Sequence, residues 1–114
     1  MTTSTILRGS IYLIEDPKKH EKPKKRPVII IQNNMGNKHS SDTIIAIIRS
    51  NPKTAELPTG VELHPGQTGL KYTSFADMGH IYTIPKELLT NRIGAVPPLI
   101  MQRINEALKA SLSI

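Results

Sequence analysis

The side chains best suited to chemistry are acid–base and cationic groups at two places in the chain. His20 and Glu21 are adjacent in a basic segment, Arg26 follows where that segment meets an apolar run, and Arg49 ends a second apolar run, residues 44–48. Cleavage of RNA by its own 2′-hydroxyl needs a base for the hydroxyl proton, an acid for the departing 5′ oxygen and a cation at the phosphorane. A guanidinium suits the last task because it stays charged and binds two phosphate oxygens. This set is therefore compatible with metal-independent RNA cleavage.

Each of these residues also has an ordinary structural interpretation. Glu21 among lysines is typical of a surface salt bridge worth less than about 1 kcal/mol. An arginine at a strand end, such as Arg49, is common as a solubilising charge at a sheet edge. A loop histidine such as His20 is most often simply exposed. From the residue types alone, both interpretations stay open.

Other catalytic chemistries lack the residues that they need. The chain has no cysteine, which excludes disulfides, thiolate metal sites and cysteine nucleophiles, and fits a reducing compartment such as the cytoplasm. Its seven glycines are scattered and form no phosphate-binding loop. The four histidines never pair four residues apart, and no Asp-x-Asp occurs, so we expect no metal and no cofactor.

The positive charge is concentrated in one segment. The chain of 114 residues has a net charge of +6, and residues 18–26 (KKHEKPKKR) contain six Lys or Arg against one Glu. A cluster of this density is typical of a protein that binds a polyanion, or of a solvated loop. In the first interpretation Lys24 and Lys25 contact phosphates, which gives affinity but little sequence choice.

The elements that must position these residues are short strands. Alternating or β-branched apolar runs predict strands over residues 6–14, with a bend or bulge at Arg8 and Gly9, and over 27–32, 42–50, 60–64, 71–76 and 80–84. Residues 33–37 have turn chemistry, with Gly36 free to adopt a positive φ.

One long helix is predicted, at the end of the chain. Pro97 and Pro98 open it, and apolar residues follow at helical spacing, after a first helical turn predicted at residues 85–89. No apolar run approaches the roughly 18 residues of a membrane span, and the first residues do not resemble a signal peptide. The pattern predicts a single domain over residues 1–114, mostly β, in which a small curled barrel is closed by a C-terminal helix.

The order of several motifs resembles the MazF/PemK family of toxin endoribonucleases. Residues 8–13 (RGSIYL) resemble the family opening R-G-[DE]-I-Y-L, and His20-Glu21, four residues, then Arg26-Pro27-Val28 resembles the loop and strand H/S-E-x-x-x-x-R-P-V. Further similarity lies in the turn after residue 31, in residues 57–62 and in the closing helix. The resemblance covers nearly the whole chain.

This resemblance implies an SH3-like curled barrel that forms a symmetric homodimer. It also implies a toxin of a toxin–antitoxin system, a cytoplasmic, metal-independent endoribonuclease that cuts single-stranded mRNA at short sequences. A cognate antitoxin would block the RNA groove with an extended, acidic tail. Carried over by motif, Arg26 binds the phosphate and assists the leaving group, and His20 and Glu21 are the catalytic loop pair.

Two departures from the family pattern affect the opposing wall of the site. Where many relatives end a strand in Thr, this chain has Arg49, followed by Ser50. Where relatives carry an acid and then Q-x-R-T-I-D, it has Gly79, His80, and Tyr82 in place of the arginine. Asp77 lies two residues before Gly79 and is expected to point differently if the strand register holds.

These two departures leave two interpretations of the function. In one, Arg49 replaces the threonine with a charge-assisted hydrogen bond, His80 supplies acid–base function, and Ser50, His80 and Tyr82 contact RNA, with Tyr82 either stacking on a base or packing in the core. In the other, catalysis is lost and the chain only binds RNA or an antitoxin. A gyrase-poisoning toxin of the same superfold is disfavoured, because the tryptophan-containing ending of those proteins is absent.

Overall fold

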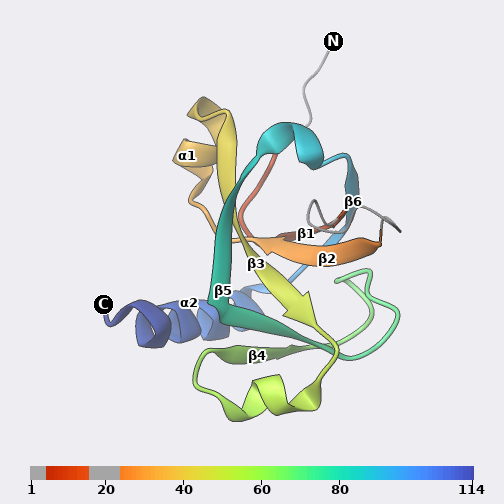
Figure 1. Cartoon of the computed structure of the whole chain (residues 1–114), viewed down its shortest axis with the longest axis vertical. Helices are drawn as coiled ribbons and strands as arrows, with labels where there is room; N and C mark the ends of the chain where they lie inside the picture. Colours follow the sequence, from red (N-terminus) through yellow and green to blue (C-terminus); the bar gives the residue numbers. More distant parts are fainter. Residues whose placement is uncertain (1–4, 16–23) are drawn as a thin grey trace.

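A single curled sheet forms most of the molecule, and every neighbouring pair of its strands is antiparallel. The computed structural model describes residues 5–15 and 24–114 (Figure 1). The strand order is β4-β5-β3-β2-β1-β6. The strands are β1 (Ser10–Glu15), β2 (Lys25–Ile30), β3 (Asp42–Arg49), β4 (Gly60–Leu63), β5 (Ser74–Pro85) and β6 (Asn91–Ala95). The predicted mostly-β fold with a curled barrel and a C-terminal helix is confirmed as a curled half-barrel.

Two α-helices and two 3₁₀ turns complete the described part of the chain. They are α1 (Asn34–His39), η1 (Pro52–Glu56), η2 (Lys86–Leu88) and α2 (Pro98–Leu112). Pro98 is the first residue of α2, as the sequence predicted, because proline lacks the N–H that would have no partner there. None of these helices is long and apolar enough to cross a membrane.

The central strands are apolar on both faces because each face is covered. On one face, Ile104 and Ala107 of α2 belong to a buried cluster that also contains Ile11, Ile29 and Ala46. On the other face, a second cluster forms around Tyr12, Val28, Ile30 and Ile45. Successive strand residues point to opposite faces, so an uninterrupted run of isoleucines fills both clusters.

The loop between β4 and β5 bridges the two edges of the curled sheet. The backbone N–H of Ala95 in β6 donates to the carbonyl oxygen of Gln67, with N and O 2.9 Å apart. A Cβ at Gly69 would lie 2.0 Å from the carbonyl oxygen of Ile93, and Gly69 has φ +73°, so only glycine fits this crossing. The loop therefore approaches β6 closely, although the two edge strands do not pair with each other.

Three sequence predictions need correction. Residues 33–37 are mostly helix α1 rather than a turn: Asn33 caps it by accepting from the N–H of Gly36, which lies inside the helix and has no positive φ. The strands predicted at 71–76 and 80–84 are one strand, β5, whose pairing with β3 shifts between Asp77 and Ile81. Strand β6 was not predicted, because its sequence NRIGA is not a run of strand formers and becomes a strand by pairing with β1.

Candidate functional site

Three side chains of β3 and β5 form a hydrogen-bonded cluster at the end of β3. Arg49 Nε donates to Asp77 Oδ2 over 2.8 Å, and His80 Nδ1 lies 2.9 Å from the same oxygen. The second carboxylate oxygen, Oδ1, accepts the backbone N–H of Gly79 over 2.9 Å. Asp77 itself is 5% exposed, whereas the side chains of Arg49 and His80 are 39% and 50% exposed. The cluster therefore has a buried acid at its base and two basic side chains that reach solvent.

The partners of Asp77 keep its carboxyl ionised. Burial alone would raise the pKa of Asp77, but hydrogen bonds from Arg49 and Gly79, together with the charges of His80 and Arg49, more than offset that effect. The pKa of Asp77 therefore lies below its ordinary value. At neutral pH the cluster holds a buried carboxylate that accepts three hydrogen bonds.

An irregularity in β5 brings Asp77 to Arg49. Asp77 pairs with Ile47, while Ile81 pairs with the neighbouring residue Ala46, so the three residues between Asp77 and Ile81 bulge out of the ladder. Cross-strand partners point to the same face, and Arg49 lies two residues after Ile47 on that face. The sequence expectation that Asp77 points differently assumed an unbroken register, and the bulge makes that assumption wrong.

Arg26 lies on the same face of the sheet and toward the same end. Val28 pairs with Ile47, and Arg26 and Arg49 each lie two residues beyond that pair, on the same side of their strands. Arg26 is exposed, and it pairs with Ile14 of β1 on its other side. The two arginines predicted to act together thus share one face, although they come from distant parts of the sequence.

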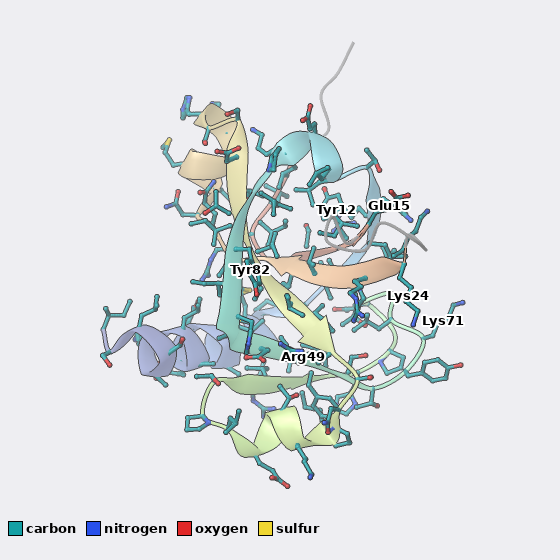
Figure 2. All side chains as sticks on the ribbon, in the orientation of Figure 1. Tyr12, Glu15, Lys24, Arg49, Lys71 and Tyr82 are labelled. Carbon is teal, nitrogen blue, oxygen red and sulfur yellow. The ribbon has the colours of Figure 1, made fainter. Side chains whose placement is uncertain are left out.

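The remaining predicted residues lie around these two strands. Lys24 and Lys25 are exposed at the start of β2, and Ser50 is exposed directly after β3. Tyr82 is 41% exposed and pairs with Ile45, so it is a surface residue rather than a core tyrosine. Figure 2 shows Tyr82 and Arg49 beside the adjacent strands β5 and β3, in the middle of the molecule. Two predicted residues, His20 and Glu21, lie outside the described residues.

Asp77 is the member of the cluster to which sequence reasoning gave no role. Its signal in the sequence was an acid inside an apolar run, Phe-Ala-Asp-Met, where a charge is costly unless it is paired. Among residues 5–15 and 24–114, no group of three or more His, Cys, Asp or Glu side chains is arranged to hold a metal ion.

Comparison with known proteins gives consistent matches over nearly the whole chain. The sequence profile of the family described as PemK-like, MazF-like toxin of type II toxin-antitoxin system matches residues 7–112. The chain is 33% identical over 111 residues to the endoribonuclease EndoA of Bacillus subtilis, covering 96% of each chain. It is 32% identical over 109 residues to the endoribonuclease MazF of Staphylococcus saprophyticus, covering 94% of this chain and 91% of the relative.

Solved structures give the same picture. An endoribonuclease in complex with its cognate antitoxin from a mycobacterial species superposes with a TM-score of 0.81. Its sequence is 28% identical, and the match covers 96% of each chain. A MazF from Deinococcus radiodurans superposes with a TM-score of 0.76 at 15% identity, which reports on the fold alone.

Proposed function

The chain belongs to the family of PemK-like, MazF-like toxins of type II toxin-antitoxin systems and is an endoribonuclease of that family, and from this premise we propose how its site cuts RNA. The substrate is single-stranded mRNA. The ribose 2′ oxygen loses its proton and bonds to the adjacent phosphorus. The bond from phosphorus to the 5′ oxygen breaks, and that oxygen takes a proton. The products are a 2′,3′-cyclic phosphate and a 5′-hydroxyl, and no metal takes part.

Arg26 and Arg49 bind the scissile phosphate in this proposal. The observation that carries it is their shared placement, on one face and at one end of two neighbouring strands. Two guanidinium groups there can stabilise the charge that builds on the phosphorane oxygens. The loop pair His20 and Glu21 completes the catalytic set by resemblance to the family.

The RNA strand runs over the exposed residues around the two arginines. Lys24 and Lys25 contact phosphates on one side, at the start of β2. On the other side Ser50 and His80 offer hydrogen-bonding groups, and the exposed ring of Tyr82 offers a surface for base stacking.

The protein acts in the cytoplasm as a homodimer of single-domain chains spanning residues 1–114, and a cognate antitoxin covers the same face with an extended, acidic tail. Support for the antitoxin comes from the structural relative solved with its own antitoxin, and support for the tail's charge comes from the basic segment at residues 18–26. The homodimer is tested by light scattering at micromolar concentration, where a mass of two chains supports it and a mass of one chain contradicts it.

The function is tested by digesting single-stranded RNA in EDTA with the wild type, Arg26→Ala and Arg103→Ala. Arg103 is also an exposed arginine, but it lies on α2, which covers the opposite face of the sheet. Removing a preorganised donor to a developing oxyanion costs about 10²–10³ in rate, so Arg26→Ala should lose that much while Arg103→Ala retains activity. If all three proteins bind RNA and none cuts it, the chain is an RNA-binding relative that has lost catalysis.

A further inference from the structure

Asp77 links the side chains of Arg49 and His80 through one carboxylate oxygen atom. Its Oδ2 accepts from Arg49 Nε and contacts His80 Nδ1, at 2.8 and 2.9 Å. We propose that Asp77 is a positioning residue that sets His80 as the proton acceptor, and Arg49 as the phosphate ligand, of the RNA cleavage site. This inference rests on the proposed function, and it gives the base of the reaction a named atom.

The hydrogen bonds determine which nitrogen of His80 carries a proton. An ionised carboxylate only accepts hydrogen bonds, so a bond between Asp77 and His80 requires the hydrogen on Nδ1. In the neutral imidazole the lone pair is then on Nε2, at the far end of a side chain that is 50% exposed. The ring is therefore held in the tautomer that a general base needs, with its basic nitrogen toward solvent and incoming RNA.

The same carboxylate orients the guanidinium of Arg49. Asp77 is bound through Nε, so the terminal nitrogens Nη1 and Nη2 are not the atoms that anchor the side chain to the acid. These terminal nitrogens can bind two phosphate oxygens in a fork. Because the side chain is 39% exposed, RNA can reach it without displacing Asp77.

Gly79 is what leaves room for this arrangement. A Cβ at position 79 would lie 3.1 Å from Asp77 Oδ1, closer than an ordinary van der Waals contact. The Gly79 N–H donates to that same oxygen. A side chain at position 79 would push against the carboxylate, and an acidic one would also repel it. The acid at position 77 therefore depends on the glycine at position 79.

Among the described residues, the charged groups that share this hydrogen-bonded cluster with His80 are Arg49 and Asp77. Strand β3 contributes Arg49, β5 contributes Asp77, and the segment before β4 contributes the uncharged Thr59, whose Oγ1 would lie 3.6 Å from a Cβ at Gly79. In the reaction, His80 Nε2 takes the 2′-hydroxyl proton as the new bond to phosphorus forms. The departing 5′ oxygen takes a proton from solvent water, and His80 then returns its proton to solvent.

The test compares Asp77→Asn and His80→Gln with Glu62→Gln. Glu62 also pairs with a histidine, with His64 Nε2 and Glu62 Oε2 3.2 Å apart, but both side chains of that pair are about half exposed or more. General acid–base groups contribute about 10²–10⁴-fold, so His80→Gln should lower kcat by about 10² or more. We expect at least a tenfold loss in kcat for Asp77→Asn, with little change in KM, and no change for Glu62→Gln.

A spectroscopic readout separates positioning from a merely structural role. The ¹⁵N chemical shifts of the His80 ring should report hydrogen on Nδ1 in the wild type and a shift toward the other tautomer in Asp77→Asn. If Asp77→Asn does not fold, Gly79→Ala crowds the same carboxylate and should give a smaller change in the same direction.

The outcomes distinguish a failure of this inference from a failure of the proposed function on which it rests. If Arg26→Ala loses cleavage while Asp77→Asn and His80→Gln keep the wild-type rate and Asp77→Asn keeps the wild-type tautomer of His80, the function stands and the positioning role is wrong. If wild type and Arg26→Ala do not differ, the proposed site is wrong, and the role of Asp77 fails with it.

Discussion

Strand β3 has a polar cluster at each end, and the two clusters differ in where their hydrogen-bonding groups point. At its start, Thr43 Oγ1 donates to Asn37 Oδ1 over 2.6 Å, and the amide of Gln32 donates to the same oxygen over 3.1 Å. The Asn37 amide in turn donates to the backbone carbonyl of Gln32. Thr43 and Asn37 are 0% and 2% exposed. At the other end, Asp77 is also buried, at 5% exposed, but its partners Arg49 and His80 reach solvent.

The comparison separates a structural network from a site suited to chemistry. The buried cluster uses its amide and hydroxyl groups inside the protein, where they join α1 to β3. The open cluster anchors each basic side chain to Asp77 through one nitrogen, and both side chains remain partly exposed. Preorganised groups of this kind stabilise developing charge without reorganising during the reaction. Damage to the first cluster should therefore lower stability, and damage to the second should lower activity.

Arg49→Thr, which restores the residue common in the family, should lower cleavage more than Asn37→Ala or the replacement of Lys24 and Lys25. A hydrogen bond to a charged group is worth about 1.5–3 kcal/mol, which corresponds to about 10- to 100-fold in rate. A threonine at position 49 would lack the partners that relatives provide, because this chain has Gly79 in place of their acid and Tyr82 in place of their arginine. Cleavage rates of Arg49→Thr and Arg49→Lys measure this, and lysine should recover only part because it lacks the fork. Unchanged or higher activity in Arg49→Thr would make Arg49 an ordinary strand-end charge.

Asn37→Ala should lower stability and leave cleavage per folded molecule unchanged. The buried hydroxyl of Thr43 would lose its partner, which costs about 1–3 kcal/mol. For a domain of this size that loss lowers Tm by roughly 4 °C per kcal/mol. Adding Thr43→Val to Asn37→Ala should recover part of the loss, because the orphaned hydroxyl is removed. An Asn37→Ala protein as stable as the wild type, or a folded one with slow cleavage, would contradict the assignment of this cluster to stability alone.

Lowering the pH should remove the contribution of Asp77 to the stability of the folded protein. Because the pKa of Asp77 is lowered in the folded state, its contribution is fully present above the ordinary carboxyl value of 3.8 and is lost as pH falls through the lowered value. Denaturant midpoints from pH 6 to pH 2 should therefore fall less steeply in Asp77→Asn than in the wild type. Asn37→Ala should keep the wild-type slope. Equal slopes for all three would show that Asp77 does not titrate as the geometry requires.

Replacing both Lys24 and Lys25 by Gln should give the smallest effect. Both are exposed and act through phosphate charge, so binding of single-stranded RNA should weaken and its salt dependence should flatten by about 1.4 in the log–log slope. The cleavage sequence should not change, as mapped by primer extension on the same transcript. A shifted cleavage sequence would mean that these lysines read bases.

The parts of the fold that depend on local pattern were predictable from the sequence. Uninterrupted isoleucines indicated the central strands, and paired prolines marked the start of α2. Strand β6 and the continuity of β5 were not, because each depends on pairing with a distant strand. Helix α1 was taken for a turn because Gly36 is a poor helix former, and its place there reflects close packing against Gln32.

In the candidate site, too, some features could be predicted from the local sequence and others depend on long-range pairing. Arg26 and Arg49 could be chosen from sequence because each stands where an apolar run meets polar residues. Their common face follows from the register of β2 and β3, which a single sequence does not contain. Asp77 was given no role because the bulge at residues 78–80 determines its contacts. Long-range pairing, rather than residue type, assembled the cluster.

The central claim, that Asp77 and His80 work as one unit in cleavage, is tested most directly by a double-mutant cycle on kcat/KM. The wild type, Asp77→Asn, His80→Gln and the double variant are compared on one RNA substrate. If Asp77 acts through His80, the double variant should be slower than His80→Gln by much less than the loss that Asp77→Asn causes in the wild type, because only the orientation of Arg49 is then left for the carboxylate to provide. Losses that multiply, so that the double variant is slower by the product of the two single effects, would contradict the claim and make the two residues independent.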